Sequence, residues 1–348
     1  MKVKALILEK PNSFEFQTIE ECWQPKPDEV LVEVNRISLC GSDYKLFYGT
    51  YNGPCKYPMR IGHEWSGIVV DIGNAVTKLV VGDRVTGDCS YWCGKCANCS
   101  IDKNMCCNIE KYGISIDGFS QQMVIVPAKY LYKANAGIPH KVLALTECFA
   151  VALHAIHAMK RKSIQLKTEK ILILGCGPIG MALAILLVKY YQFKNVQVFD
   201  PITTRVQFLK RILPEVDLAA SITTTKPINY RDYYQDSEYS LIFEASGQIE
   251  ALQQGIDLLK PKGNIITLGM YPKAIVDLSK IVIKSLTVTG SIGGTGEFPQ
   301  ILKFFSEYKD LVELLVTTEY NYDDAKTAFT EFNKEIDLKV QILFTNRG

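Results

Sequence analysis

The sequence predicts an α/β protein in which a β-rich N-terminal part precedes a parallel sheet covered by helices. Up to about residue 145, short runs rich in Val and Ile are interrupted by Gly, Pro, Asn and Asp, which is typical of many short strands. From about 165 to 290, apolar strand-like runs alternate with helical patterns. That alternation indicates a doubly wound parallel sheet.

The composition predicts a soluble, cytoplasmic protein of about two domains with a small-molecule partner. The chain has 348 residues, of which 47% are hydrophobic and 22% charged, as in ordinary globular proteins. A net charge of +2 without a long basic run argues against nucleic-acid binding. The longest apolar run, GMALAILLV, is far shorter than the roughly 20 residues of a membrane span. The N-terminus lacks the apolar core of a signal peptide.

Residues 88–110, DCSYWCGKCANCSIDKNMCCNIE, contain six cysteines that could form disulfides, a metal site or reactive thiols. A disulfide framework is not expected in a cytoplasmic protein. The spacing favours a metal site formed by Cys93, Cys96, Cys99 and Cys107. Two residues separate the first three cysteines from one another, and seven residues separate the third from the fourth. Four thiolates leave no open position, so this zinc would be structural. Cys89 and Cys106 fall outside the spacing.

The turn GCGPIG, residues 175–180, follows the apolar run ILIL and opens a helical pattern. Glycines at this place permit a tight turn and close approach to a pyrophosphate, as in a Rossmann dinucleotide site. The residues expected to bind the cofactor there are Gly175, Gly177, Pro178, Ile179 and Gly180. Asp200 ends the next strand, twenty residues past Gly180, and favours NAD over NADP through the adenosine ribose. Arg205 could stack on adenine or weaken that preference.

Two later segments lie where further strands of the same sheet are expected to end. They are FEASG, residues 243–247, and TLGMY, residues 267–271. Ligands bind at the carboxyl ends of such strands, so Ala245 and Gly269 are predicted to face the nicotinamide half of the cofactor.

Several motifs occur in an order that resembles the zinc-dependent medium-chain dehydrogenases over essentially the whole chain. They are CGSD at 40–43, GHEWSG at 62–67, VGDRV at 81–85, the cysteine segment, ECFAVALHA at 147–155 and GCGPIG. The resemblance implies a GroES-like catalytic domain over 1–150, a Rossmann NAD-binding domain over 151–290, and a C-terminal segment, 291–348, that returns to the catalytic domain.

The resemblance also implies a second, catalytic zinc, for a total of two per subunit. Its ligands would be Cys40, His63, Glu64 and Glu147, the last either directly or through a water molecule. Zinc would act as a Lewis acid on a hydroxyl or carbonyl group. Ser42 occupies the family's first proton-relay position. Lys45 stands where many alcohol dehydrogenases have a relay histidine, and could instead be a solvated or substrate-contacting cation.

The motifs are most similar to those of sorbitol-like polyol, sugar-alcohol-phosphate and aminocyclitol dehydrogenases. We therefore expect hydride transfer between NAD(H) and a secondary alcohol or ketone of a polyol, sugar alcohol or cyclitol. An arginine of sorbitol dehydrogenases has no match in residues 290–298, and Leu46 replaces an aromatic residue. Lys56 and Arg60, with Lys45, could meet a phosphate or simply be solvated.

Two other functions stay open: a threonine-type or amino-alcohol dehydrogenase, and an NAD-binding protein that has lost catalysis. Retention of the implied zinc ligands together with Ser42 speaks against the second. LTVTGSIGG, residues 286–294, resembles the edge strand through which relatives pair their sheets. A homodimer or homotetramer is therefore expected.

Overall fold

The structure is a computed structural model that describes residues 2–160, 169–222, 228–235, 237–271 and 275–345. The chain divides into two compact units, the first formed by residues 1–150 and 294–348 and the second by residues 151–293. The helix α4 (Thr146–Lys160) runs across the first boundary. Each unit is described by itself.

The first unit is built mainly of short strands, as the Val- and Ile-rich N-terminal runs predict. Its strands are β1 (Lys2–Lys10), β2 (Ser13–Glu20), β3 (Glu29–Ser38), β4 (Met59–Arg60), β5 (Glu64–Ile72), β6 (Arg84–Gly87), β7 (Ser90–Tyr91), β8 (Glu110–Lys111), β9 (Met123–Pro127), β10 (Leu131–Lys133), β17 (Val316–Asn321) and β18 (Lys339–Leu343). Its helices are α1 (Gly41–Phe47), α2 (Ala97–Ile101), α3 (His140–Leu143), α9 (Phe298–Glu313) and α10 (Thr327–Thr330).

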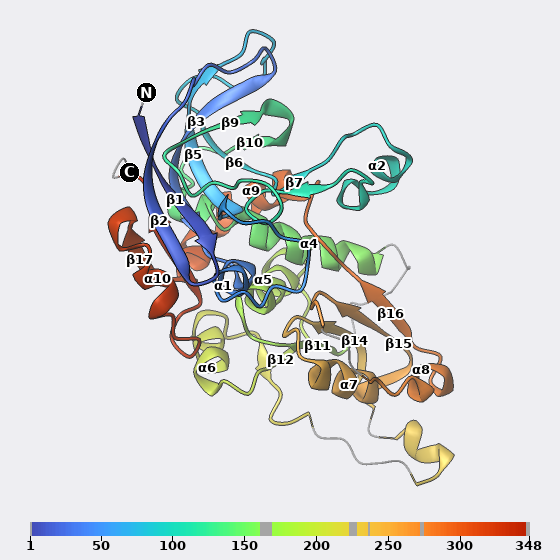
Figure 1. Ribbon diagram of the computed structural model, residues 1–348. Coiled ribbons are helices and arrows are strands. Elements are labelled where there is room, and N and C mark those ends of the chain that lie inside the picture. The colour runs from blue at the N-terminus through green and yellow to red at the C-terminus, as the bar shows by residue number, and fades with distance from the viewer. Residues whose placement is uncertain (1, 161–168, 223–227, 236, 272–274, 346–348) are drawn as a thin grey trace. The chain divides into compact units, whose positions relative to one another are not determined.

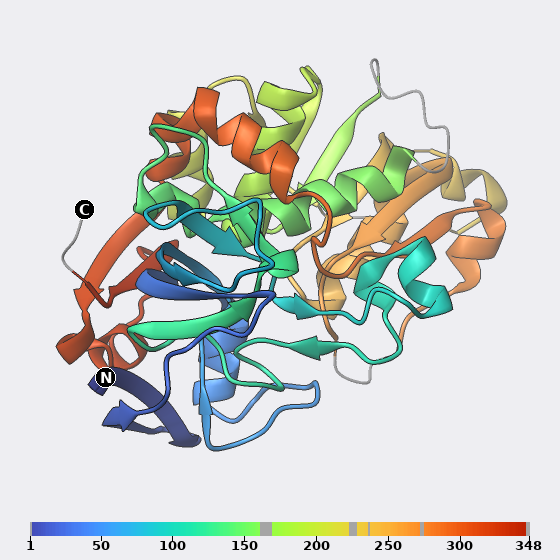
Figure 2. The same cartoon turned by 90° about the horizontal axis from the view of Figure 1, so that it is seen from above.

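The C-terminal strands of this unit join a sheet made by the N-terminal half of the chain. The largest sheet has the order β10-β6-β5-β3-β18-β17, with β9 also paired to β3. Figure 2 shows the C-terminal strands of this unit, in red, beside its N-terminal strands, in blue. The strands β3 and β18 are antiparallel, and Ser38 lies opposite Gln341. This register brings the start of β18 beside the end of β3, where the motif CGSD begins.

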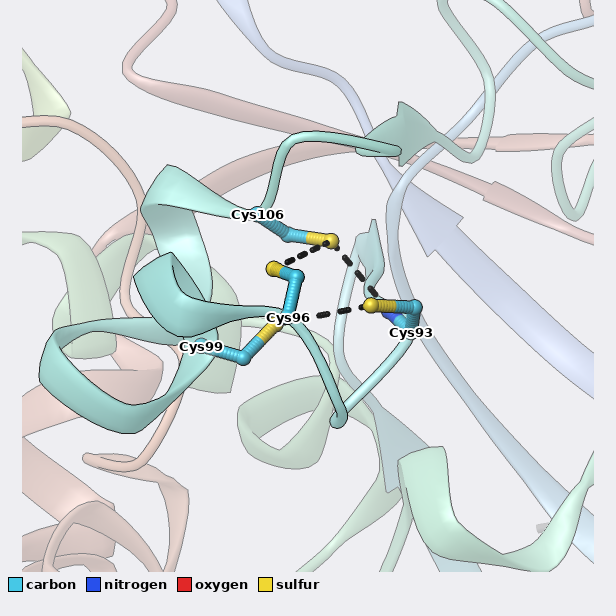
Figure 3. Close-up of side chains that lie close together, drawn as sticks. All are labelled: Cys93, Cys96, Cys99 and Cys106. Carbon is cyan, nitrogen blue, oxygen red and sulfur yellow. Dashed lines mark hydrogen bonds between the residues drawn. The ribbon is translucent and has the colours of Figure 1, made fainter.

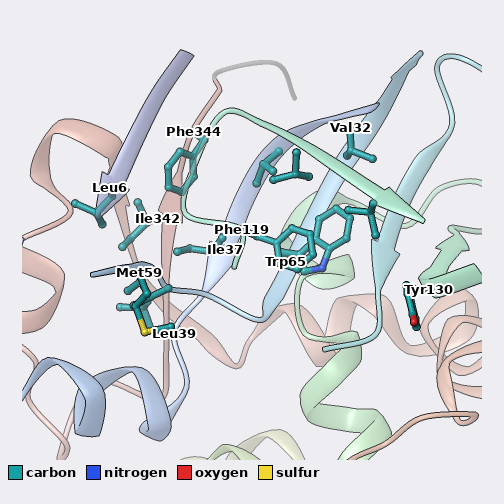
Figure 4. Close-up of a cluster of buried hydrophobic side chains, with 14 of the residues drawn as sticks. Leu6, Val32, Ile37, Leu39, Met59, Trp65, Phe119, Tyr130, Ile342 and Phe344 are labelled. Atoms are coloured by element: carbon teal, nitrogen blue, oxygen red, sulfur yellow. The ribbon is translucent and has the colours of Figure 1, made fainter. Parts of the chain in front are cut away.

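Aromatic and aliphatic side chains from both ends of the chain fill the core of the first unit (Figure 4). Trp65 is fully buried and stacks on Phe119, with ring centroids 4.1 Å apart and planes 11° apart. Such a pair contributes about 0.5–1.5 kcal/mol beyond its burial. Because Trp65 directly follows His63 and Glu64, this stacking fixes the start of β5.

The second unit is the predicted parallel sheet with helices. Its strands are β11 (Ile171–Leu174), β12 (Val196–Phe199), β13 (Asp217–Leu218), β14 (Tyr239–Glu244), β15 (Leu259–Thr267) and β16 (Thr287–Gly290), and its helices are α5 (Pro178–Ile185), α6 (Thr203–Ile212), α7 (Ile249–Leu258) and α8 (Ser279–Ile283). All pairs in the order β13-β12-β11-β14-β15-β16 are parallel (Figure 1). The order reverses on the two sides of β11, which is where such sheets bind ligands.

Among the described residues, no helix combines the length and the apolar character needed to cross a bilayer.

Candidate active site

Three of the four residues predicted to hold the catalytic zinc come together in the first unit. Cys40 is the N-cap of α1, and His63 and Glu64 stand at the start of β5. The antiparallel register of β3 and β5 places Ser38 opposite Glu64, so the turn after β3 carries Cys40 to the same place. One ligand atom from each of Cys40, His63 and Glu64 lies within 4.8 Å of the other two. Sulfur, nitrogen and carboxylate oxygen are the donors that zinc prefers.

Asp43, for which no role was predicted from the sequence, connects the two segments that carry the predicted zinc ligands. It is fully buried. Its Oδ2 accepts the backbone N–H of Cys40 at 2.8 Å, and its Oδ1 accepts that of Gly62 at 3.3 Å and lies 3.6 Å from Nδ1 of His63. Burial alone would lower the pKa of His63, but acidic neighbours, Asp43 first, raise it to about 10. The acidic neighbours thus make the surroundings of His63 electronegative, which suits a metal cation in place of the proton.

Ser42, the predicted proton-relay residue, lies in the first turn of α1. Its Oγ is 3.4 Å from Nε2 of His63. The hydroxyl is thus in contact with a predicted zinc ligand, while Lys45 on the same helix is exposed. Leu46 is fully buried in the core of the unit.

A buried lysine compensates the charge of Glu64. Nζ of Lys339 is 2.5 Å from both carboxylate oxygens of Glu64 and also donates to the carbonyl of Leu39 at 3.4 Å. Both side chains of the ion pair are 2% exposed or less. Burial would lower the pKa of Lys339, but the charge of Glu64 raises it above its usual value. Lys339 begins β18, so its position follows from the pairing of β18 with β3.

We expect Lys339→Met to destabilise the metal-free protein strongly. The substitution leaves a buried carboxylate without its counter-charge, which costs about 3–5 kcal/mol. Zinc on Glu64 would supply part of that positive charge, so the loss should be smaller in zinc-loaded protein. The measurement is the free energy of unfolding in urea with and without a chelator. Lys2→Met, in the exposed pair with Glu20, serves as the control and should change little. Equal stabilities of Lys339→Met and wild type would contradict the role.

Glu147, the fourth predicted ligand, lies near this group, but it is not among the residues whose ligand atoms all lie within 4.8 Å of one another. It stands in the first turn of α4 and is buried. Its Oε1 accepts a hydrogen bond from Sγ of Cys89 at 3.2 Å. Burial raises the pKa of Glu147, whereas the nearby His63 lowers it.

The cysteine segment gathers four sulfur atoms, but the fourth differs from the predicted one (Figure 3). Sulfur atoms of Cys93, Cys96, Cys99 and Cys106 lie within 4.8 Å of one another. The pairs Cys93–Cys99 and Cys96–Cys106 are 3.9 and 4.0 Å apart. The predicted residue, Cys107, is exposed and stands outside this group.

Local backbone geometry explains the difference at the fourth position. A 3-10 turn, Lys103–Met105, is capped by the side chain of Asp102, which accepts the N–H of Asn104. Cys106 ends this turn as its C-cap, and the thiol of the next residue, Cys107, also interacts with the sulfur of Cys96. Sγ of Cys106 also accepts the backbone N–H groups of Cys93 at 3.3 Å and Asn108 at 3.4 Å.

The other thiols of this cluster differ in how readily they ionise. Backbone N–H groups of Cys107 and Cys99 lower the pKa of Cys96 to about 5. Burial raises the pKa of Cys99 to about 12. The ionised Cys96 offers a ready ligand, whereas Cys99 would release its proton on binding a metal.

In the second unit, the turn between β11 and α5 has the form expected of a pyrophosphate site. A Cβ at Gly180 would lie 1.9 Å from the carbonyl oxygen of Gly175, so only glycine allows this approach. Gly175 has a φ of +100°. The helix α5 begins at Pro178 with Gly177 as its N-cap, and no side chain caps it. Its first N–H groups are therefore available to an anion.

Asp200 is bound to this turn. Its Oδ2 accepts the N–H of Cys176 at 2.7 Å, and its Oδ1 accepts that of Ile202 at 2.8 Å. A guanidinium nitrogen of Arg205 would lie 3.7 Å from a Cβ at Gly177. Asp200 and Arg205 therefore both stand at the glycine turn.

The two later loops also reach this edge of the sheet. The N–H of Ala245, directly after β14, donates to the carbonyl of Leu174 at 2.8 Å. Gly269, after β15, packs against Gly247, where an added Cβ would lie 2.6 Å from the neighbouring Cα. The structure thus gathers all the predicted cofactor-binding residues at the carboxyl edge of one sheet.

Comparison with known proteins identifies the family. The family model described as alcohol dehydrogenase GroES-like domain matches residues 26–136, and the one described as glucose dehydrogenase C-terminus matches residues 141–342. A sorbitol dehydrogenase of Halalkalibacterium halodurans is 29% identical over 97% of this chain and 98% of its own. An L-threonine 3-dehydrogenase of Coxiella burnetii is 29% identical over 77% and 78%.

Among solved structures, the alcohol dehydrogenase RspB of Escherichia coli, complexed with NADH, has a TM-score of 0.85 and 27% identity over 99% of both chains. These similarities confirm the predicted GroES-like and Rossmann fold classes. The chain therefore belongs to the polyol branch of the zinc-type medium-chain dehydrogenases, NAD(P)-dependent enzymes that act on alcohols.

Proposed function

We propose that this protein transfers hydride between NAD(H) and a secondary alcohol or ketone of a polyol, sugar alcohol or cyclitol. The observation that carries the proposal is the convergence of Cys40, His63 and Glu64 within 4.8 Å. A zinc ion held there would supply Lewis-acid polarisation of the substrate oxygen. Ser42 contacts His63 and is the residue proposed to take the hydroxyl proton.

Charge pairing favours a substrate without phosphate. Arg60 was one of three basic residues considered for phosphate binding, and its Nη2 lies 2.5 Å from Asp117. Its Nη1 is 3.7 Å from Glu21 and donates to Gln121 at 2.9 Å. Lys45 and Lys56 are exposed. Arg60, one of these three cations, is therefore already paired with acidic partners.

The proposal is tested by NAD(H)-coupled absorbance at 340 nm with polyols, ketoses, their phosphates, aminocyclitols and L-threonine. Turnover confined to unphosphorylated polyols or cyclitols, and abolished by a chelator, is the expected result. L-threonine is the second candidate substrate, because the threonine dehydrogenase and sorbitol dehydrogenase relatives have the same identity. Turnover of L-threonine alone would replace the polyol proposal. If zinc-loaded protein were inactive with every compound of the panel, the alternative of an NAD-binding protein that has lost catalysis would be favoured.

We propose NAD as the cofactor, and expect Asp200→Asn to weaken the preference for it. The carboxylate would accept from the adenosine ribose and repel a 2′-phosphate. The amide keeps an acceptor for the N–H of Cys176 while removing the charge. The ratio of kcat/KM for NAD to that for NADP should fall by about tenfold or more, equivalent to about 1.4 kcal/mol. Asp217→Asn, at an exposed position on β13, is the matched control. An unchanged ratio would exclude Asp200 as the selectivity residue.

A further inference from the structure

Cys89 is a buried thiol that lies outside the cysteine cluster and contacts the predicted catalytic site. It follows β6 and precedes β7, and only 5% of its surface is exposed. Its Sγ is 3.2 Å from Oε1 of Glu147, in the geometry of a thiol donating to a carboxylate. The hydroxyl of Ser90 is a second polar neighbour of this sulfur, at 3.9 Å.

The backbone around Cys89 is held on both sides. The N–H of Asp88 donates to the carbonyl of Tyr130, and the carbonyl of Cys89 accepts the N–H of Tyr112, both at 2.9 Å. The buried side chain of Asp88 accepts the N–H of Ser90 at 2.9 Å and the indole N–H of Trp92 at 3.3 Å. A thiol on such a rigid segment can fix the position of the group it contacts.

The group it contacts is the predicted zinc ligand that stands apart from the other three. Ligand atoms of Cys40, His63 and Glu64 lie within 4.8 Å of one another, whereas Glu147 does not belong to this group. One oxygen of Glu147 accepts a hydrogen bond from Cys89, and its carboxyl group also interacts electrostatically with His63 and Glu64. The second oxygen is therefore the one that could coordinate a metal or accept a hydrogen bond from a metal-bound water.

We propose that Cys89 is a positioning residue for Glu147: its thiol holds one carboxylate oxygen and thereby sets how the other oxygen serves the zinc at Cys40, His63 and Glu64. The inference rests on the proposed function of that site. Partners that hold a zinc ligand from outside typically change metal affinity or activity by about 10–100-fold when removed. A buried cysteine that merely fills space would affect stability and leave the metal site unchanged.

The test compares Cys89→Ala, which removes the donor, with Cys89→Ser, which keeps an O–H donor. The dissociation constant of the more weakly bound zinc is measured by competition with a chromophoric chelator. The absorption spectrum of protein carrying cobalt at that site is recorded alongside. We expect Cys89→Ala to shift the dissociation constant by about tenfold or more and to change the cobalt spectrum. Cys89→Ser should largely restore both.

Two further variants separate positioning from packing. Val85→Ala opens a cavity at a fully buried position of β6 without touching a carboxylate, so it should lower Tm and leave zinc affinity unchanged. Glu147→Gln combined with Cys89→Ala should show little additional loss beyond Glu147→Gln, because both act through one contact.

The outcomes distinguish failure of this inference from failure of the proposed function. If wild type binds the second zinc and turns over polyols, while Cys89→Ala matches it in zinc affinity and cobalt spectrum, the positioning role is wrong and the function stands. A wild type that binds no zinc beyond the cysteine cluster overturns both. If Cys89→Ala lost zinc affinity and Cys89→Ser lost it equally, the role of Cys89 would be one of packing.

Discussion

Cys40→Ser is expected to remove the catalytic zinc and turnover while leaving the fold intact. Zinc content should fall from about two to about one per chain. Loss of Lewis-acid stabilisation worth several kcal/mol should lower kcat/KM by about a thousandfold or more. The fold should survive because serine can keep the capping box of α1, in which the side chain of residue 40 accepts the N–H of Asp43 and the carboxylate of Asp43 accepts the N–H of residue 40.

The measurements are metal content, steady-state kinetics on the best substrate of the panel, and thermal unfolding. Cys22→Ser, at an exposed free cysteine, is the matched control and should equal wild type in all three. Cys40→Ser protein that keeps both zinc ions and a tenth of the wild-type kcat/KM would remove Cys40 from the ligand set.

Local patterns predicted those parts of the site that depend on neighbouring residues. The turn at 175–180 precedes a helix that begins at Pro178, and β14 and β15 end at Glu244 and Thr267, next to the residues predicted to bind cofactor. These follow from glycine sterics and from the alternation of strands and helices, both of which are written in consecutive residues.

Contacts that depend on strand register could not be predicted from local sequence patterns. Lys339 pairs with Glu64 across 275 positions of sequence, because β18 pairs with β3 and β3 with β5. No local pattern around KVQILFT marks a buried lysine. The signal that could have been used was a charged residue opening a final strand in which, Gln341 apart, the other residues are apolar.

Cys89 was missed for a different reason. The spacing that defines a thiolate cage excludes it, and a cysteine outside the cage carries no local mark of its partner. Only the packing of the first turn of α4 against the segment between β6 and β7 brings its sulfur to Glu147.

The fourth thiol of the cysteine cluster gives the second large effect: Cys106→Ser should lose the structural zinc, and Cys107→Ser should keep it. The spacing predicts Cys107, whereas Cys106, which ends the turn at Lys103–Met105, is the residue whose sulfur lies within 4.8 Å of the other three. A structural zinc contributes about 10–16 kcal/mol of binding free energy. Losing one of four thiolates should therefore cost several kcal/mol and lower Tm by about 5 °C or more.

Because the two cysteines are adjacent and chemically identical, each variant controls for the other. Zinc content and Tm are measured for both, with turnover as a check that the catalytic ion remains. Sγ of Cys106 accepts two backbone N–H groups, so its loss also leaves those donors unpaired, whereas replacing the exposed Cys107 removes its thiol contact with Cys96. The reverse result, with zinc lost from Cys107→Ser and kept by Cys106→Ser, would restore the spacing-based ligand set and show that metal binding rearranges this turn.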